Sequence, residues 1–284
     1  MPGCTSGPLH PDWRDRRGLP IGQGRSAPSH LEDIIVIEAA VIDLNRLRHS
    51  CGQCSLHQLC LPETMAKADM ERLDSLVKRR RPLTRGGVLF RSGDAMSALF
   101  VARDGAFKTT ALGEDGSMQV IGFHLPGELI GLDALGDGAH RCDAEALGPA
   151  SVCEIPFNDL SRLAAELPSL QRQLLRIIGR SVGRDQDHLE MMGRRHASER
   201  LALFLYSLSE RYQALGHCER EFSLPMSRED IASYLGMVIE TVSRTFSRLQ
   251  EDGVIAVRGR QLRILDGTRL AKLAHEPESQ RLRG

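Results

Sequence analysis

The spacing of hydrophobic and polar residues divides the chain into regions of different texture. Residues 1–30 consist mainly of Pro, Gly, Ser and Arg with few aliphatic side chains, which predicts a disordered extension. An N-terminal segment over 31–65 opens with a crowded apolar run, whose periodicity fits a helix or a strand equally well. A short amphipathic helix is expected over 66–78. From 81 to 157, short β-runs alternate with glycine turns at intervals of roughly 8–12 residues, which is typical of a small barrel or sandwich.

Residues 168–194 carry the pattern of one long helix. Apolar residues recur at intervals of three, four or seven, namely at Leu170, Leu174, Ile178, Val182, Leu189 and Met192. Such a stripe fits the seam of a parallel coiled-coil dimer, and the alternative is a helix packed on its own barrel. Asp185 lies on the same stripe, so two carboxylates would face each other in a symmetric dimer. Like charges repel and are costly to desolvate, which predicts a weak, switchable dimer.

The stretch 227–249 has the pattern of a helix-turn-helix. Ser227 can cap the first helix with Asp230 three residues later, and Gly236 supplies the turn. The shared apolar face consists of Ile231, Leu235, Val242, Phe246 and Leu249. Residues 253–265 then read as a β-hairpin, which would form the wing. The alternative is an ordinary two-helix unit with a solvated charged face.

The second helix of this unit presents side chains suited to reading DNA. Glu240 and Arg244 are four residues apart and therefore lie on one face. Arginine can bond O6 and N7 of guanine, and a carboxylate can accept from N4 of cytosine. Arg248, Arg258 and Arg260 are better placed for phosphates, which position a protein without specifying sequence.

Three cysteines, Cys51, Cys54 and Cys60, lie within ten residues. Thiolate is the soft ligand that selects iron–sulfur clusters, zinc or Cu(I), and such centres take four ligands, so a fourth must lie elsewhere. The alternatives are ordinary thiols or a redox dithiol.

Composition narrows the class of protein. Lys and Arg total 37 of 284 residues, as do Asp and Glu, so any basic face must be local. The sequence has no run of 18 apolar residues and no signal-peptide pattern, which predicts neither a membrane span nor export. An odd number of cysteines, seven, then favours a reducing cytoplasm.

Taken together, these regions resemble the Crp/Fnr family of bacterial transcription regulators. Three stretches resemble the oxygen-sensing Fnr branch in particular, namely 121–134 (IGFHLPGELIGLDA), 152–157 (VCEIPF) and 183–187 (GRDQD). The resemblance covers roughly residues 48–275. It implies an α+β fold with a cyclic-nucleotide-binding-like β-roll (jelly-roll) sensor domain over 66–165, a dimerisation helix over 166–195 and a winged helix-turn-helix over 196–284.

The resemblance also implies site residues. The family's [4Fe–4S] ligands match Cys51, Cys54, Cys60 and Cys153, whereas Cys4, Cys142 and Cys218 match none. The recognition pattern Glu-x-x-Ser-Arg matches Glu240, Ser243 and Arg244, which implies a TTGAT half-site, and the family's acidic seam residue matches Asp185. The dimer interface is thus expected at Ile178, Val182, Asp185, Leu189 and Met192.

Two features of the expected sensor domain bear on whether it binds a cyclic nucleotide or RNA polymerase. The region around Arg141, Cys142 and Asp143 lacks the Arg-Ser pair of the cyclic-nucleotide branch, and Asp143 would repel a phosphate, so no cyclic nucleotide is expected. In the family, the barrel loop around Gly116 and Ser117 can touch RNA polymerase. Ser117 stands where an acidic residue is often found, which argues against this particular polymerase contact.

The resulting hypothesis is a cytoplasmic, homodimeric, oxygen-responsive activator of anaerobic genes. It would bind double-stranded DNA at TTGAT-N4-ATCAA while its cluster is intact. The alternatives are a regulator of the same fold that senses by zinc or thiol oxidation, and an iron–sulfur electron carrier or enzyme. Against an enzyme, the sequence shows no Gly-rich phosphate loop and no catalytic Ser/His/Asp arrangement.

Overall fold

The structure is a computed structural model that describes residues 51, 54, 56, 65–79, 82–194 and 196–275. Its contacts separate Met1–Arg48 from a compact unit, His49–Gly284. The extension expected over 1–30 and the apolar run over 31–48 lie outside the described residues. The compact unit contains the elements that the glycine-punctuated and helical patterns predicted, and it is the part described below.

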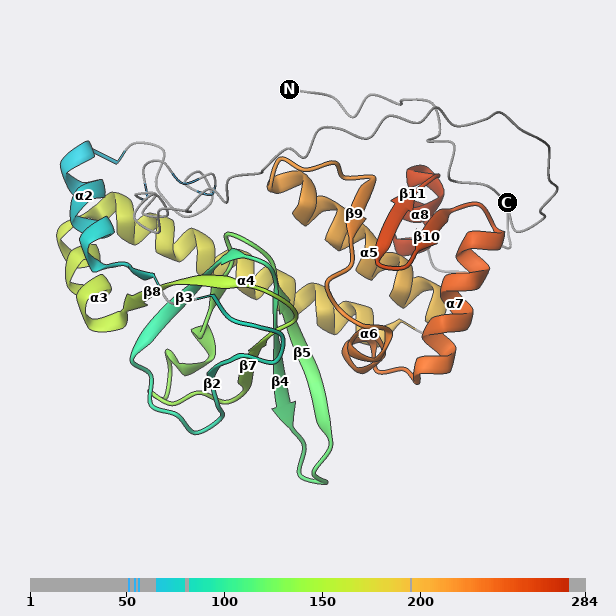
Figure 1. Cartoon of the computed structure of the whole chain (residues 1–284), viewed down its shortest axis with the longest axis horizontal. Helices are drawn as coiled ribbons and strands as arrows, with labels where there is room; N and C mark the ends of the chain where they lie inside the picture. The colour runs from blue at the N-terminus through green and yellow to red at the C-terminus, as the bar shows by residue number, and fades with distance from the viewer. Residues whose placement is uncertain are drawn as a thin grey trace, which may run out of the picture. The chain divides into compact units, whose positions relative to one another are not determined.

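The sensor domain is built from two antiparallel sheets (Figure 1). One has the strand order β1-β8-β3-β6 and the other β2-β7-β4-β5. Buried aromatic and aliphatic side chains from strands of both sheets, including Phe90, Phe100, Phe107 and Val152, form its core. The elements are α2 (Lys67–Leu76), β1 (Lys78–Arg79), β2 (Val88–Phe90), β3 (Ala98–Asp104), β4 (Phe107–Leu112), β5 (Met118–His124), β6 (Leu129–Ile130), η3 (Leu132–Ala134), β7 (Asp143–Ala146) and β8 (Ser151–Pro156).

Two details show how local sequence shapes this domain. The helix expected over 66–78 ends at Leu76, because Lys78 and Arg79 instead pair with Glu154 and Cys153 of β8. At the β3–β4 turn, Gly105 has a φ of +73°, and a Cβ there would lie 2.4 Å from the carbonyl oxygen of Pro149. Only glycine fits this turn.

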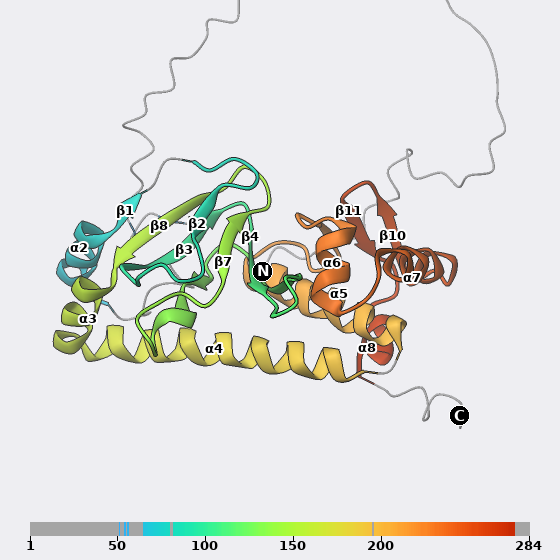
Figure 2. The ribbon, with the colours of Figure 1, turned by 90° about the horizontal axis from the view of Figure 1, so that it is seen from below.

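A long helix links the two functional parts of the unit. After α3 (Phe157–Glu166), α4 runs unbroken over Pro168–Gly193, with Pro168 in its first turn, where a missing N–H costs nothing. Figure 2 shows α4 running beside the sensor strands and on to the C-terminal helices. Leu170 and Ile177 are buried, while Leu175 and Leu189 are exposed, so the helix has a packed face and an open face.

The C-terminal domain contains α5 and a helix pair followed by a hairpin. Its three-stranded sheet has the order β10-β11-β9. Buried side chains such as Leu205, Ile231, Phe246 and Leu262 join the helices to the sheet. The elements are α5 (Ala197–Ala214), β9 (Glu221–Ser223), α6 (Arg228–Leu235), α7 (Ile239–Glu251), β10 (Ile255–Arg258), β11 (Gln261–Ile264) and α8 (Gly267–His275). Among the described helices, none has the length and apolar character needed to cross a membrane.

Candidate metal centre and nucleic-acid interface

Three of the four cysteines expected to act as ligands border one cavity. Cys51, Cys54 and Cys153 line it together with aliphatic side chains from α2, β3, β6 and α4, among them Leu73, Val101, Leu129, Leu170 and Ile177. Arg103 contributes the one charged side chain among the described lining residues. Three cysteine side chains around one cavity place soft sulfur donors close to a single enclosed space.

Backbone pairing holds these cysteines in place. Cys153 lies on β8 between two neighbouring strands, opposite Val101 of β3 and Arg79 of β1. The backbone N–H of Cys51 donates to the carboxylate of Asp74 on α2 (2.9 Å), and that of Cys54 donates to the carbonyl of Cys51 (3.3 Å). Asp74 and Arg103 carried no signal in the sequence, because their role comes from residues that are distant along the chain.

The coordination sphere itself is not assembled in the described part of the chain. Cys60 lies outside the described residues. Among the residues that the structure does describe, no three Cys, His, Asp or Glu side chains are close enough to hold a metal ion. A set of thiols around an apolar cavity nevertheless fits the donor chemistry of a thiolate-bound iron–sulfur or zinc centre.

Cys142 lies in a different environment from the cavity cysteines. It is buried in the sensor core, and its Sγ donates to Oδ2 of Asp133 at 3.4 Å. Burial, reinforced by the negative charge of Asp133, raises the pKa of this thiol far above its usual range. A thiol that stays protonated is a poor metal ligand, which agrees with its lack of a match in the family pattern.

A second cavity of about 300 Å³ lies between the sensor strands and α4. Asp133 and Asp185 both line it, together with the polar side chains of Thr109, His124 and Ser181. The Asp133 carboxylate accepts from the backbone N–H of Arg141 (2.8 Å). Asp143, to which the sequence argument assigned the repulsion of a phosphate, instead lies 3.8 Å from the guanidinium of Arg91.

Most residues of the expected dimer seam lie on the exposed face of α4. Val182 is 48% exposed and Leu189 72%, and Ile178 is half-buried beside them. Partial burial raises the pKa of Asp185, with the positive charge of Arg184 acting in the opposite direction. Leu175, 62% exposed and one heptad before Val182, lies on this face and was not singled out from the sequence.

The apolar residues that the sequence groups into one stripe therefore lie on two different faces of α4. Leu170 is buried against its own sensor domain and Leu174 packs at the edge of that cluster. Met192 also turns inward: a Cβ on Gly236 would lie 2.6 Å from its Cε. The structure thus places Met192 against the helix-turn-helix of its own chain, at the end of the expected seam.

The helix-turn-helix forms as its local signals predicted. Ser227 Oγ accepts from the backbone N–H of Asp230 (3.0 Å), and Asp230 Oδ2 accepts from that of Ser227 (2.8 Å), which completes a capping box. Gly236 ends α6 with a φ of +60°. This left-handed conformation favours glycine, which has no Cβ.

The expected DNA-reading residues lie together on the outer face of α7. Glu240, Ser243 and Arg244 are exposed, while Val242 and Phe246 on the opposite face of the helix are buried. Arg248, Arg258 and Arg260 are exposed on α7 and the hairpin. Arg260 also donates to the carbonyl of Pro225 (2.8 Å), so it anchors the hairpin tip to the start of the helix-turn-helix.

Comparison with known proteins agrees with this geometry. Residues 199–273 match the model of a Crp-like helix-turn-helix domain, and residues 80–166 match that of a cyclic nucleotide-binding domain. Over 224 residues, which cover 79% of this chain and 92% of the relative, the chain is 46% identical to the transcriptional activator protein Anr of Pseudomonas protegens. The chain belongs to the Crp/Fnr family, in its Fnr branch.

Other Crp/Fnr proteins support the same placement. The chain is 41% identical to the fumarate and nitrate reduction regulatory protein of Escherichia coli K12, over 79% of this chain and 90% of that protein. The structure of FixK2 from Bradyrhizobium japonicum matches with a TM-score of 0.64 at 30% identity, covering 70% of this chain and 97% of that one. The expected fold and the expectation of a DNA-binding transcription regulator, not an enzyme, are therefore confirmed.

Proposed function

We propose that this Fnr-type regulator responds to oxygen through a [4Fe–4S] cluster held by Cys51, Cys54, Cys60 and Cys153. The observation that carries the proposal is the shared apolar cavity of Cys51, Cys54 and Cys153. With the cluster intact, the protein would bind TTGAT-N4-ATCAA as a homodimer in the cytoplasm and control anaerobic genes.

The cluster would supply an oxygen-sensitive covalent link between the 51–60 segment and strand β8. Around that site, aliphatic side chains from α2, β3 and α4 exclude water, and Arg103 lines the same cavity. Leu170 and Ile177 of α4 line the same cavity, so a change at the cysteines can reach the dimerisation helix by direct packing.

Asp185 gives the dimer its sensitivity. Its carboxylate lies on the open face of α4 with Val182 and Leu189, so two copies would repel each other across a parallel seam. A ligand shifts an equilibrium only by its differential affinity for the two states, so the cysteines must hold their cluster more tightly in the paired form. Without that link, the repulsion would separate the subunits.

The exposed face of α7 supports palindrome recognition. Arg244 would contact guanine, Glu240 the opposite cytosine and Ser243 a nearby thymine. Arg248, Arg258 and Arg260 would contact phosphates, with Arg260 also anchoring the wing. A dimer places two such helices one turn of DNA apart.

The β4–β5 hairpin is the proposed contact with RNA polymerase. Its flanks expose Leu112 (67%) and Met118 (52%). At the tip, the hydroxyl and backbone N–H of Ser117 donate to Asp115 Oδ1 (2.6 and 3.0 Å) and lower the pKa of that carboxyl. The tip therefore keeps a negative charge at Asp115 although position 117 is a serine.

One experiment tests the sensor. The protein is purified under argon, its visible spectrum, iron and acid-labile sulfide are measured, and the same sample is used for a gel shift before and after exposure to air. We expect a brown protein that binds the palindrome and loses both properties in air. A colourless protein with one zinc ion would instead favour the zinc regulator. Air-sensitive binding without iron would favour direct thiol oxidation.

A further inference from the structure

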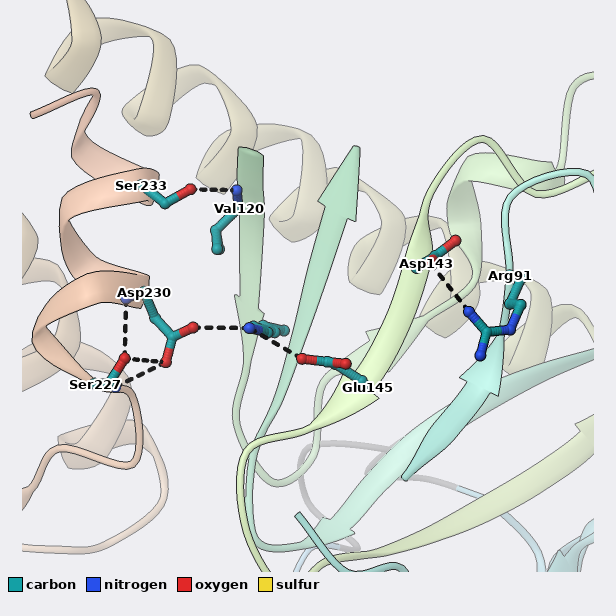
Figure 3. Close-up of polar contacts among 8 residues, drawn as sticks. Arg91, Val120, Asp143, Glu145, Ser227, Asp230 and Ser233 are labelled. Carbon is teal, nitrogen blue, oxygen red and sulfur yellow. Dashed lines mark hydrogen bonds and ion pairs between the residues drawn. The ribbon is translucent and has the colours of Figure 1, made fainter. Parts of the chain in front are cut away.

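The first helix of the helix-turn-helix is docked on the sensor barrel of its own chain. Two polar contacts cross between them (Figure 3). Lys108 Nζ on β4 lies 2.8 Å from Oδ1 of Asp230, and the backbone N–H of Val120 on β5 donates to Oγ of Ser233 at 2.8 Å. Asp230 and Ser233 are one turn apart on α6, so both contacts use the same face of that helix.

Lys108 is held from both sides. Its Nζ also lies 2.9 Å from Oε1 of Glu145, its register partner on β7. The side chains of Lys108, Asp230 and Glu145 are only 19%, 10% and 34% exposed. Burial alone would lower the pKa of Lys108, but hydrogen bonds to Asp230 and Glu145 raise it, so the ammonium keeps its charge. Ion pairs this withdrawn from water contribute more than exposed ones.

Asp230 divides its two carboxylate oxygens between the two domains. Oδ2 accepts from Ser227 and starts α6, whereas Oδ1 receives the ammonium of Lys108. The pKa of Asp230 is lowered, because hydrogen bonds from Lys108 and Ser227 outweigh the effect of burial, which raises it. The capping box that begins α6 therefore contains the same carboxylate that Lys108 of the barrel contacts.

A second anchor reaches α6 from the dimerisation helix. The ring of His188 on α4 stacks on Tyr234 with centroids 3.9 Å apart, and its Nε2 lies 2.8 Å from the carbonyl of Tyr234. Phe123 at the end of β5 packs on the same tyrosine, at 4.9 Å. All these contacts use α6 and leave Glu240 and Arg244 of α7 exposed.

We propose that Lys108 is a positioning residue for DNA binding, which docks α6 on the sensor barrel with the reading face of α7 turned to solvent. Two half-sites can be read only if both recognition helices are held at the spacing of one DNA turn. If the winged domain rotates relative to the sensor barrel, the two recognition helices have this spacing for a smaller fraction of the time. The apparent dissociation constant rises by the inverse of that fraction.

Lys108→Met in the full-length anaerobic protein tests this role. We expect operator binding to weaken on the order of tenfold, with the preference for TTGAT over a mutated half-site unchanged. Hydrogen exchange at the amide of Val120 should become faster, because the helix that accepts its bond is released. Lys108→Arg, which keeps a cation, should restore both properties. Ser233→Ala, which changes no charge, should act in the same direction as Lys108→Met.

One matched control separates docking from barrel stability. Arg91→Met removes an ion pair with Asp143 within the sensor domain (Figure 3) and should bind DNA like the unmodified protein. Glu145→Gln leaves the Lys108–Asp230 contact in place but weakens one of the two contacts that hold Lys108, so it should weaken binding less than Lys108→Met does. In a double-mutant cycle, Asp230→Asn keeps an oxygen for Ser227 and should add little to Lys108→Met.

The proposal is overturned if Lys108→Met binds the operator as well as the unmodified protein or better, or if Arg91→Met loses as much affinity. The inference rests on the paired DNA binding given under the proposed function but not on its oxygen response. Exchange at Val120 is measured without DNA, so docking is tested even if the operator is bound equally in air and under argon. That last result would count only against the oxygen response.

Discussion

Cys51 and Cys153 line the same apolar cavity, although one precedes the first described helix of the sensor domain and the other lies on its last strand. The barrel brings them together because β8 pairs with both β1 and β3, and because Asp74 of α2 holds the backbone of Cys51. A centre bound here would tie the N-terminal segment to the sheet.

Replacing Cys153 with serine is expected to abolish cluster loading. A serine hydroxyl is a hard donor and does not replace a thiolate ligand of iron–sulfur clusters. After anaerobic purification, iron and acid-labile sulfide should fall to background. Cys142→Ser is the matched control, since Cys142 lies elsewhere in the core and its pKa is strongly raised by burial. Equal iron loss in both variants would point to general unfolding of the sensor domain.

Asp185→Ala is expected to give DNA binding in air. Removing the carboxylate removes the repulsion across the proposed seam, so the dimer no longer depends on the cluster. Sedimentation and gel shifts of air-exposed protein measure this. Asp187→Ala is the control, because Asp187 lines a different cavity, with Arg180 and Glu210. Unchanged oxygen sensitivity in Asp185→Ala would contradict the repulsion mechanism.

Arg244→Ala is expected to cost about 1–3 kcal/mol on the correct site and to relax specificity at one base pair. Arg248→Ala should instead weaken binding about equally on all sequences and reduce the salt dependence by one phosphate contact. Titrations of both variants on single-base operator variants at several salt concentrations measure the difference. A uniform loss for Arg244→Ala would make it a phosphate contact.

His124 should make the folded state sensitive to acid. Burial lowers its pKa to about 4, with the positive charges of Arg211 and Arg184 acting in the same direction and Glu128 opposing them. Between an unfolded pKa near 6.5 and the folded value, the unfolded chain binds a proton that the folded chain does not, so stability falls as the pH decreases through this window. The loss should be on the order of 2–3 kcal/mol between pH 7.5 and pH 4.5.

Urea unfolding of the air-exposed protein at both pH values measures this contribution. His124→Gln cannot take up the proton, so its free energy of unfolding should change less between the two pH values. An identical pH dependence in both proteins would show that other groups cause the acid sensitivity.

The sequence by itself determined the local structure and the family. The capping box of Ser227 and Asp230, the turn at Gly236 and the glycine-punctuated strands depend on neighbours within a few residues, so their patterns could be read directly. The same holds for the spacing of Glu240, Ser243 and Arg244 on one helical face. Cys153 was found only through the family pattern, because nothing near it in sequence distinguishes it from a core residue.

The tertiary structure decided which side chains are buried and what each of them packs against. The apolar stripe of α4 is one pattern in sequence, but packing buries Leu170, exposes Leu189 and turns Met192 toward Gly236. The pairing of Lys108 with Asp230 joins residues far apart along the chain. Periodicity shows which residues share one face of a helix, but not what that face packs against. Contacts between residues that are distant along the chain exist only once the chain has folded.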